Sequence, residues 1–198
     1  MSAISAALVK ELRDKSGAGM MDCKNALVEA KGDLDKAGEI LRKKGIAKAT
    51  KKADRAANEG RIEAYIHPGS KLGVLLEVNC ETDFVANTED YARFCRDVAM
   101  QIAASAPRFV RREDVDQQTI DQEMEIYKEQ ARNQGKPENI LEKIAAGKLE
   151  KFYSEICLLE QPFVKDPDKN IQTLLTETIA RLGENITINR FTRFKIGE

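Results

Sequence analysis

Few residues of this chain are of the types that carry out catalysis, and their positions limit the chemistry available to it. The 198 residues include a single histidine, His67, so a nucleophile activated by a histidine base would have to be built around it. His67 lies in the turn-like stretch His67-Pro68-Gly69-Ser70, which favours a solvated hairpin residue. No glycine-rich phosphate-binding motif occurs. The sequence therefore predicts a protein that is not an enzyme, with no catalytic residue, no cofactor and no metal site.

Four cysteines offer a second, thiol-based chemistry. Cys23, Cys80, Cys95 and Cys157 are scattered along the chain, form no Cys-x-x-Cys pair, and fall on apolar faces of the expected helices and strands. This spacing predicts neither a disulfide framework nor a zinc site. A thiol-dependent enzyme stays open only as a minor hypothesis. It is minor because no histidine that could activate a thiol is near any of these cysteines in the sequence.

The most unusual local sequence follows a strand expected over residues 72–80. It reads Thr82, Asp83, Phe84, Val85, and a helix is expected to begin soon after it. In one interpretation Thr82 or Asp83 caps a turn and Phe84 packs inward. In the other, Phe84 is an exposed wedge on a rigid strand end and Asp83 is a polar partner for another protein's loop, since exposed aromatic residues often anchor interfaces.

The overall composition excludes several classes of partner. Hydrophobic residues make up 42% and charged residues 33%, and 32 Lys and Arg against 33 Asp and Glu leave a net charge of −1. No global positive field attracts nucleic acid or anionic membrane. The apolar runs are too short to cross a bilayer, and the first residues lack the features of a signal peptide. We expect a cytoplasmic protein with no membrane partner and no specific nucleic-acid partner.

The elements that position these residues begin with three short helices. Apolar residues recur at helical spacing from Ile4, a glycine-rich turn at 16–19 interrupts them, and the last helix is expected to end at Gly45. Residues 1–45 are therefore predicted to form a small three-helix domain.

Residues 46–58 carry no apolar stripe and form a predicted linker. The basic residues here and just before it are Lys43, Lys44, Lys48, Lys51, Lys52 and Arg55. They could form an RNA-contacting arm or belong to a solvated helical linker. Because no aromatic residue lies between them to stack on bases, we favour the linker.

Residues 59–198 are predicted to form an α+β core domain. The hydrophobic period changes to two at Gly60, which predicts a hairpin over 60–80 whose first strand places Ile62, Ala64 and Ile66 on one face.

Helices are expected within 88–183 and a last strand over 185–196. One of the helices is expected to be interrupted near Gly147, and Pro162 and Pro167 bound an expected loop. This order predicts a three-stranded antiparallel sheet packed with helices.

Four segments, in the same order along the chain, resemble the translation elongation factor Ts family. They are residues 12–24, residues 77–87 around Thr-Asp-Phe-Val, residues 151–166, and Leu-Gly-Glu-Asn-Ile at 182–186. One segment alone is suggestive, whereas the four together are specific and extend over most of the chain. Longer members carry two related halves in the core, and this chain resembles the short bacterial form, which holds one half and pairs as a homodimer.

The resemblance implies a guanine-nucleotide exchange factor for elongation factor Tu in protein synthesis. In the family, an N-terminal three-helix unit, ubiquitin-associated-like in fold, docks on the GTPase, and a tip intrudes beside the nucleotide and displaces Mg²⁺. The residues that match these roles are Thr82, Asp83, Phe84 and Val85 at the tip, and Met20 and Met21 at the docking surface.

Two positions depart from the family pattern. Ser16 stands where many members have threonine, which keeps the hydroxyl, and Asn87 replaces a basic residue, which puts a charge contact there in doubt. The polar helix expected over 113–133 is either a subunit contact of the homodimer or an ordinary solvated helix. The alternative function is an RNA- or protein-binding adaptor that uses the basic stretch 43–55.

Overall fold

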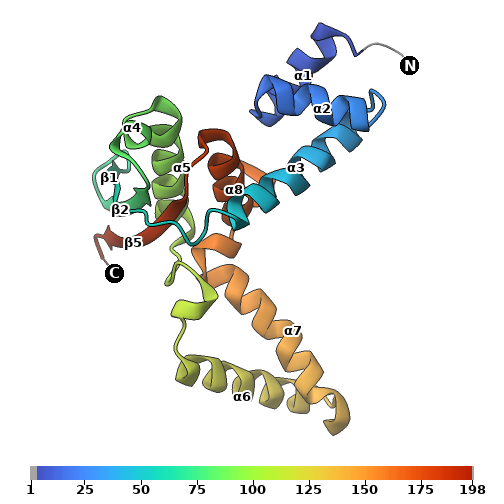
Figure 1. Ribbon diagram of the computed structural model, residues 1–198. Coiled ribbons are helices and arrows are strands. Elements are labelled where there is room, and N and C mark those ends of the chain that lie inside the picture. The colour runs from blue at the N-terminus through green and yellow to red at the C-terminus, as the bar shows by residue number, and fades with distance from the viewer. Residues whose placement is uncertain (1–3, 198) are drawn as a thin grey trace. The chain divides into compact units, whose positions relative to one another are not determined.

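The computed structural model describes residues 4–197 and has an α+β fold (Figure 1). It confirms the three N-terminal helices, which are α1 (Ala6–Ser16), α2 (Met20–Glu29) and α3 (Leu34–Thr50). Ser5 caps α1 by accepting the N–H of Leu8, and Asp33 caps α3 by accepting the N–H groups of Asp35 and Lys36. Their shared core is small, and its fully buried members are Cys23, Ala26, Leu27 and Ala37.

Helix α3 extends five residues beyond Gly45, where the sequence predicted its end. Gly45 is buried, and a Cβ atom there would lie 3.5 Å from the Cβ of Ala180 in α8 (Ile171–Leu182). The glycine therefore lies inside α3, at a contact between two helices where a Cβ atom would still fit, and it does not end the helix. A single glycine inside a helix costs only about 1 kcal/mol, which the following alanine and lysine residues readily offset.

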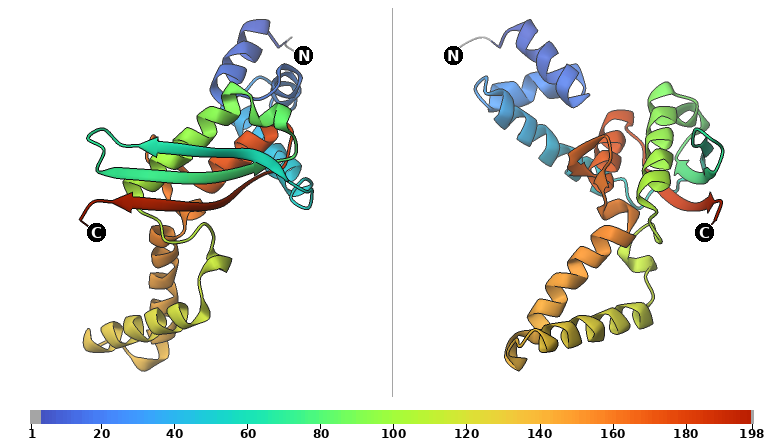
Figure 2. Two further views of the ribbon diagram at one scale, coloured as in Figure 1. Left: turned by 90° about the vertical axis from the view of Figure 1, so that its left-hand side faces the viewer. Right: turned by 180° about the vertical axis from the view of Figure 1, so that it is seen from behind.

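The predicted three-stranded antiparallel sheet is present, and its strand order is β1-β2-β5. Its strands are β1 (Glu59–Ile66), β2 (Leu72–Cys80) and β5 (Ile186–Lys195), and the left-hand view of Figure 2 shows them side by side. Val74, Leu76, Val78 and Cys80 of the central strand are buried and alternate with less buried residues.

The predicted alternation in β1 is present, but its apolar residues do not face the core. Ile62 and Ile66 are 70% and 62% exposed, whereas Glu63 is buried and its carboxylate lies 3.6 Å from the Arg96 guanidinium. A period of two identifies the residues that share a face, and it does not say which face points inward. The exposed isoleucines therefore lie on a face of β1 that is open to solvent.

The remaining helices follow the predicted order, with one additional short helix and one correction. They are α4 (Asp83–Ala86), α5 (Glu89–Ser105), α6 (Gln117–Asn133) and α7 (Glu138–Ile156), with short 3₁₀ turns at Arg112–Asp114 and Leu158–Glu160. Helix α7 passes through Gly147 without the predicted interruption. Helix α6 packs against α7, and its predicted stripe, including Ile120 and Tyr127, is used in that contact.

The loop predicted between Pro162 and Pro167 contains a small antiparallel sheet instead. Its strands are β3 (Pro162–Phe163) and β4 (Asp166–Asn170). The buried amide of Gln101 donates to the side-chain oxygen of Gln161 at 3.1 Å and to the carbonyl of Pro162 at 3.2 Å. These buried polar contacts hold a segment whose sequence shows no alternating pattern.

The described residues form two compact units. The first contains residues up to Ile62, with 77–95 and 173–187, and therefore holds α1–α4, most of α8 and the adjoining strand ends. The second contains residues 63–76, 96–172 and 188–197, with α6, α7 and the small sheet. No helix within residues 4–197 is both long enough and apolar enough to cross a membrane.

Candidate functional site

Residues 82–85, called the tip below, form a single helical turn at the end of β2. Thr82 caps α4, because its hydroxyl oxygen accepts the Val85 N–H at 3.3 Å. Phe84 is 79% exposed, whereas the next two residues, Val85 and Ala86, are buried. Thr82 therefore caps a turn, as one interpretation of the sequence expected, while Phe84 is exposed, as the other expected.

The base of the tip is fixed by two buried side chains. The Cys80 thiol donates to the carbonyl oxygen of Thr82 at 3.1 Å, and the Tyr91 hydroxyl donates to the carbonyl oxygen of Val78 at 2.7 Å. Phe84 therefore follows a strand end whose backbone is fixed by hydrogen bonds from two buried side chains.

The cysteines are placed as structural residues. Cys23, Cys80, Cys95 and Cys157 are all buried. Burial raises the pKa of the Cys80 thiol, and it raises the pKa of Cys157 to about 11. Because the thiolate is the nucleophile, these two groups are largely unreactive near neutral pH.

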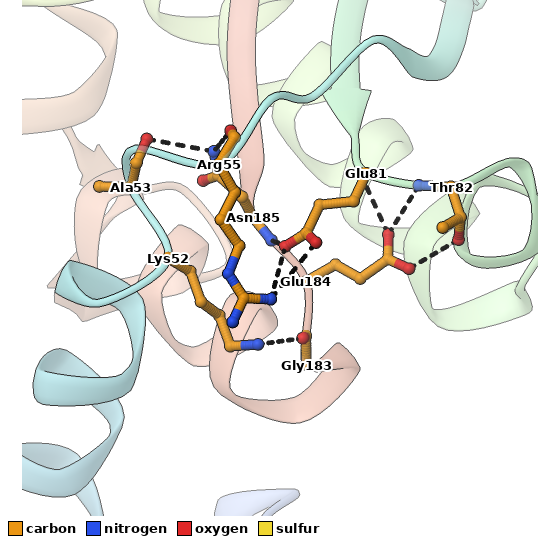
Figure 3. Close-up of polar contacts among 8 residues, drawn as sticks. All are labelled: Lys52, Ala53, Arg55, Glu81, Thr82, Gly183, Glu184 and Asn185. Carbon is orange, nitrogen blue, oxygen red and sulfur yellow. Dashed lines mark hydrogen bonds and ion pairs between the residues drawn. The ribbon is translucent and has the colours of Figure 1, made fainter.

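A carboxylate from a distant part of the chain contacts the tip (Figure 3). Residues 183–185, called the clamp loop below, connect α8 to β5. Glu184 in this loop accepts the Thr82 hydroxyl at 2.6 Å with one oxygen. Its other oxygen accepts the backbone N–H groups of Glu81 at 3.1 Å and Thr82 at 3.0 Å. One side chain thereby satisfies three donors at the start of the tip.

The side chain of Glu81, in turn, contacts the backbone of the clamp loop. The Glu81 carboxylate accepts the backbone N–H of Asn185 at 2.6 Å and lies 3.4 Å from the Arg55 guanidinium. The N–H of Asn185, with additional help from the positive charges of Arg55 and Lys52, holds the pKa of Glu81 below its usual value. Glu81 is therefore ionised, and its charge is balanced, at neutral pH.

The segment after α3 is attached to the same loop. The Asn185 side-chain amide donates to the carbonyl oxygens of Ala53 at 3.3 Å and Arg55 at 2.8 Å, and Lys52 donates to the carbonyl oxygen of Gly183. These contacts, all drawn in Figure 3, connect the predicted linker to the base of the tip. The sequence predicted the linker and the tip separately, and assigned Glu184 and Asn185 no role of their own.

Most of the basic stretch has partners within the chain. Lys44 pairs with Glu29 at 2.7 Å and Lys48 with Asp22 at 2.8 Å, both across the α2–α3 surface. Lys52 and Arg55 contact the clamp loop and Glu81 as described above. These contacts support the linker interpretation over an RNA-contacting arm.

Met20 and Met21 are the first two residues of α2. Met20 is 45% exposed and Met21 is 63% exposed, and Val28 on the same helix is 59% exposed. We call these three residues the N-terminal patch. Val28 was not predicted as a docking residue, although its position seven residues after Met21 places both side chains on one helical face.

The two positions that depart from the family pattern have local structural roles. Asn87 ends α4, and its side-chain amide donates to the carbonyl oxygen of Asp83 at 2.9 Å. The Ser16 hydroxyl donates to the carbonyl oxygen of Leu12 at 2.6 Å. Among residues 4–197 the structure gathers no group of three or more His, Cys, Asp or Glu side chains that could hold a metal ion.

Comparison with known proteins covers nearly the whole chain. The family model described as Elongation factor TS matches residues 18–198. The protein named Elongation factor Ts from Carboxydothermus hydrogenoformans is 61% identical over 195 residues, which cover 98% of this chain and 90% of that relative. Its namesake from Caldanaerobacter subterraneus subsp. tengcongensis is 60% identical over 98% of both chains. The one from Anaeromyxobacter sp. strain K is 62% identical over 100% of this chain and 90% of the relative.

Proposed function

This chain belongs to the elongation factor Ts family, and we propose that it is a guanine-nucleotide exchange factor for elongation factor Tu in cytoplasmic protein synthesis. The observation that carries the proposal is the exposed Phe84 ring on a base whose backbone is hydrogen-bonded to the buried side chains of Cys80 and Tyr91. An aromatic side chain left in water at a fixed point is suited to enter a partner's surface.

The proposed mechanism is displacement of Mg²⁺ from the partner. Phe84 and Asp83 are the tip residues that contact the GTPase beside its nucleotide, while Thr82 caps the turn and the buried Val85 anchors it in the protein. Mg²⁺ on the partner neutralises the phosphate charge, so a GTPase that loses it holds GDP less tightly. The exchange factor needs no catalytic group of its own, because it acts by binding the empty GTPase better than the loaded one.

A binding measurement tests this coupling. The chain should bind nucleotide-free elongation factor Tu at least about a hundredfold more tightly than the GDP–Mg²⁺ form, and GDP should be weakened by the same factor. Calorimetric titration of both forms measures the two affinities. Equal affinities for the two forms would remove the proposed function.

We assign docking to the three-helix domain, residues 1–45, and exchange to the core domain, residues 59–198. Residues 46–58 connect them. The N-terminal patch supports this assignment because methionine side chains adapt to a partner's surface.

Truncating the N-terminal patch should weaken binding without changing the chemistry at the nucleotide. The double variant Met21→Ala, Val28→Ala is expected to raise the concentration needed for half-maximal GDP release about tenfold or more, with the maximal rate unchanged. Ile46→Ala, which truncates an exposed residue of α3, is the control and should change neither value. A lower maximal rate with unchanged half-saturation would contradict the division of roles.

We further propose that the chain forms a homodimer through the exposed face of its sheet. In the second unit Ile66, Leu75, Phe194 and Ile196 are all at least 50% exposed and line a groove of about 520 Å³. A second copy is the occupant we favour, because the short form of the family is expected to pair and because a two-fold axis would place the same apolar face on both subunits. Helix α6, the sequence-based candidate for this contact, already uses its stripe against α7.

A charge on the sheet face should separate the subunits. Phe194→Lys is expected to weaken dimerisation at least about thirtyfold, because it places an unpaired charge in an apolar contact. Sedimentation velocity over a range of concentrations measures this. Ile126→Lys on α6, a residue 48% exposed, should leave the dimer intact. If Ile126→Lys separates the subunits and Phe194→Lys does not, the contact lies on α6 instead.

A further inference from the structure

We propose that Glu184 is a positioning residue for nucleotide exchange, which acts through Thr82 to set the direction in which Phe84 is presented. Glu184 touches neither the nucleotide nor the partner in this account. The inference rests on the proposed function, because it concerns how well the tip performs that function.

The first support is the number and direction of the contacts made by one side chain. The Glu184 carboxylate accepts two consecutive backbone N–H groups, those of Glu81 and Thr82, and the Thr82 hydroxyl. Two N–H groups bound to one oxygen fix the local path of the chain as it leaves β2. The start of the tip is therefore held by a charged acceptor that lies outside β2 and α4.

The second support is that the same contact orients the cap. The Thr82 hydroxyl hydrogen is directed to Glu184, which leaves a lone pair of this oxygen to accept the Val85 N–H. Without Glu184 the hydroxyl could rotate, and the α4 cap would lose its fixed direction. Phe84 lies between these two hydrogen-bonded residues, so its backbone direction depends on both.

The third support is that the clamp loop is itself held in place. Glu81 accepts the N–H of Asn185, Asn185 donates to two carbonyl groups of the linker, and Lys52 donates to Gly183. Arg55 beside Glu81 offsets the negative charge brought in by the two carboxylates. Glu184 thus transmits a fixed position from the clamp loop to the tip.

The chemistry of the acceptor makes a graded test possible. In Glu184→Gln the remaining oxygen can still accept the two N–H groups, and its amide can donate to the Thr82 oxygen. In Glu184→Ala all three donors lose this acceptor. Glu184→Gln should therefore retain most of the positioning, and Glu184→Ala should retain little of it.

The local contact is tested by amide hydrogen exchange on the full-length protein. In Glu184→Ala the amides of Glu81, Thr82 and Val85 should exchange about tenfold faster, as expected when hydrogen bonds to a charged acceptor are lost. Amides in α1 and α2 should be unchanged. Glu125→Ala on α6, where the side chain of Glu125 is 75% exposed, removes the same charge elsewhere and should alter none of the three.

The functional consequence is tested by GDP release from elongation factor Tu. Glu184→Ala should lower the maximal stimulated rate at least about tenfold with little change in half-saturation, because displacing an interacting group by about 1 Å can cost a hundredfold. In a Phe84→Ala background the same substitution should have no further effect, because there is no ring left to position. A merely structural role would lower stability and add its effect in both backgrounds.

Two failures can be told apart. If the unaltered chain does not stimulate GDP release, the proposed function fails and the positioning role fails with it. If the unaltered chain stimulates release and Glu184→Ala stimulates it equally, the positioning role alone is wrong. The same conclusion follows if the loss of rate caused by Glu184→Ala adds fully to the loss caused by Phe84→Ala.

Discussion

Replacing Phe84 with alanine is expected to lower the stimulated rate of GDP release about a hundredfold while leaving the fold intact. The ring is 79% exposed, so its removal creates no cavity and gives up little buried area. A central aromatic anchor at an interface commonly contributes about 2–4 kcal/mol, and about 2.7 kcal/mol corresponds to about a hundredfold in rate. The expected signature is therefore a large functional loss at nearly constant stability.

Two measurements on the same samples separate the alternatives. The first is the rate of GDP release. The second is thermal unfolding, in which the free energy of unfolding should change by no more than about 0.5 kcal/mol, as is usual for a surface substitution. Ile126→Ala is a matched control, because it truncates an exposed apolar side chain on α6, which contributes no residue to the tip. If Phe84→Ala unfolds the protein, the side chain belongs to the core and the tip interpretation is wrong.

The largest effect on stability is expected at Gly60 in β1. A Cβ atom at this position would lie 2.2 Å from the carbonyl oxygen of Val78 and 2.7 Å from the Cα of Asn79, both in β2. The φ angle of +151° adds backbone strain for any side chain. Because the obstructing atoms are backbone, the two strands would have to separate. Gly60→Ala should therefore cost about 3 kcal/mol or more of unfolding free energy.

Substitutions at two other glycines show how much of the destabilisation expected for Gly60→Ala comes from backbone strain and how much from steric obstruction. Gly69 has a φ of +90°, and a Cβ atom there would meet no other atom within 4 Å, so Gly69→Ala measures strain alone and should cost about 1–2 kcal/mol. Gly147 in α7 has neither strain nor an obstruction, and Gly147→Ala should stabilise by up to about 1 kcal/mol. Denaturant unfolding ranks the three. A Gly60→Ala variant no less stable than Gly69→Ala would show that the strands tolerate the added atom.

The order of the main elements was predictable because most of the helices and strands have their own hydrophobic period, which β3 and β4 lack. The pattern of α8 and the alternation of β2 depend on neighbours within a few residues, which the sequence displays directly. The inward face of β1 was not predictable, because the apolar Ile62 and Ile66 are exposed while Glu63 is buried. That choice depends on what covers the sheet, which no local pattern records.

Features of the site that depend on neighbouring residues were predictable from the sequence. Contacts between residues far apart in the sequence were not. Thr82 as a cap could be expected from its residue type and its place before a short helix. Glu184 contacts Thr82 across 102 residues of sequence, from a polar loop with no periodicity. Only the paired ends of β2 and β5 bring these residues together, so the clamp contact appears once the fold is known.

The measurement that tests the central claim most directly is the release of a fluorescent GDP analogue from elongation factor Tu, followed by stopped flow with increasing concentrations of this protein. We predict a saturable acceleration well above the spontaneous rate, and a loss of most of it with Phe84→Ala. No acceleration at saturating protein, or an equal acceleration by Phe84→Ala, would contradict the claim that this chain exchanges nucleotide through its tip.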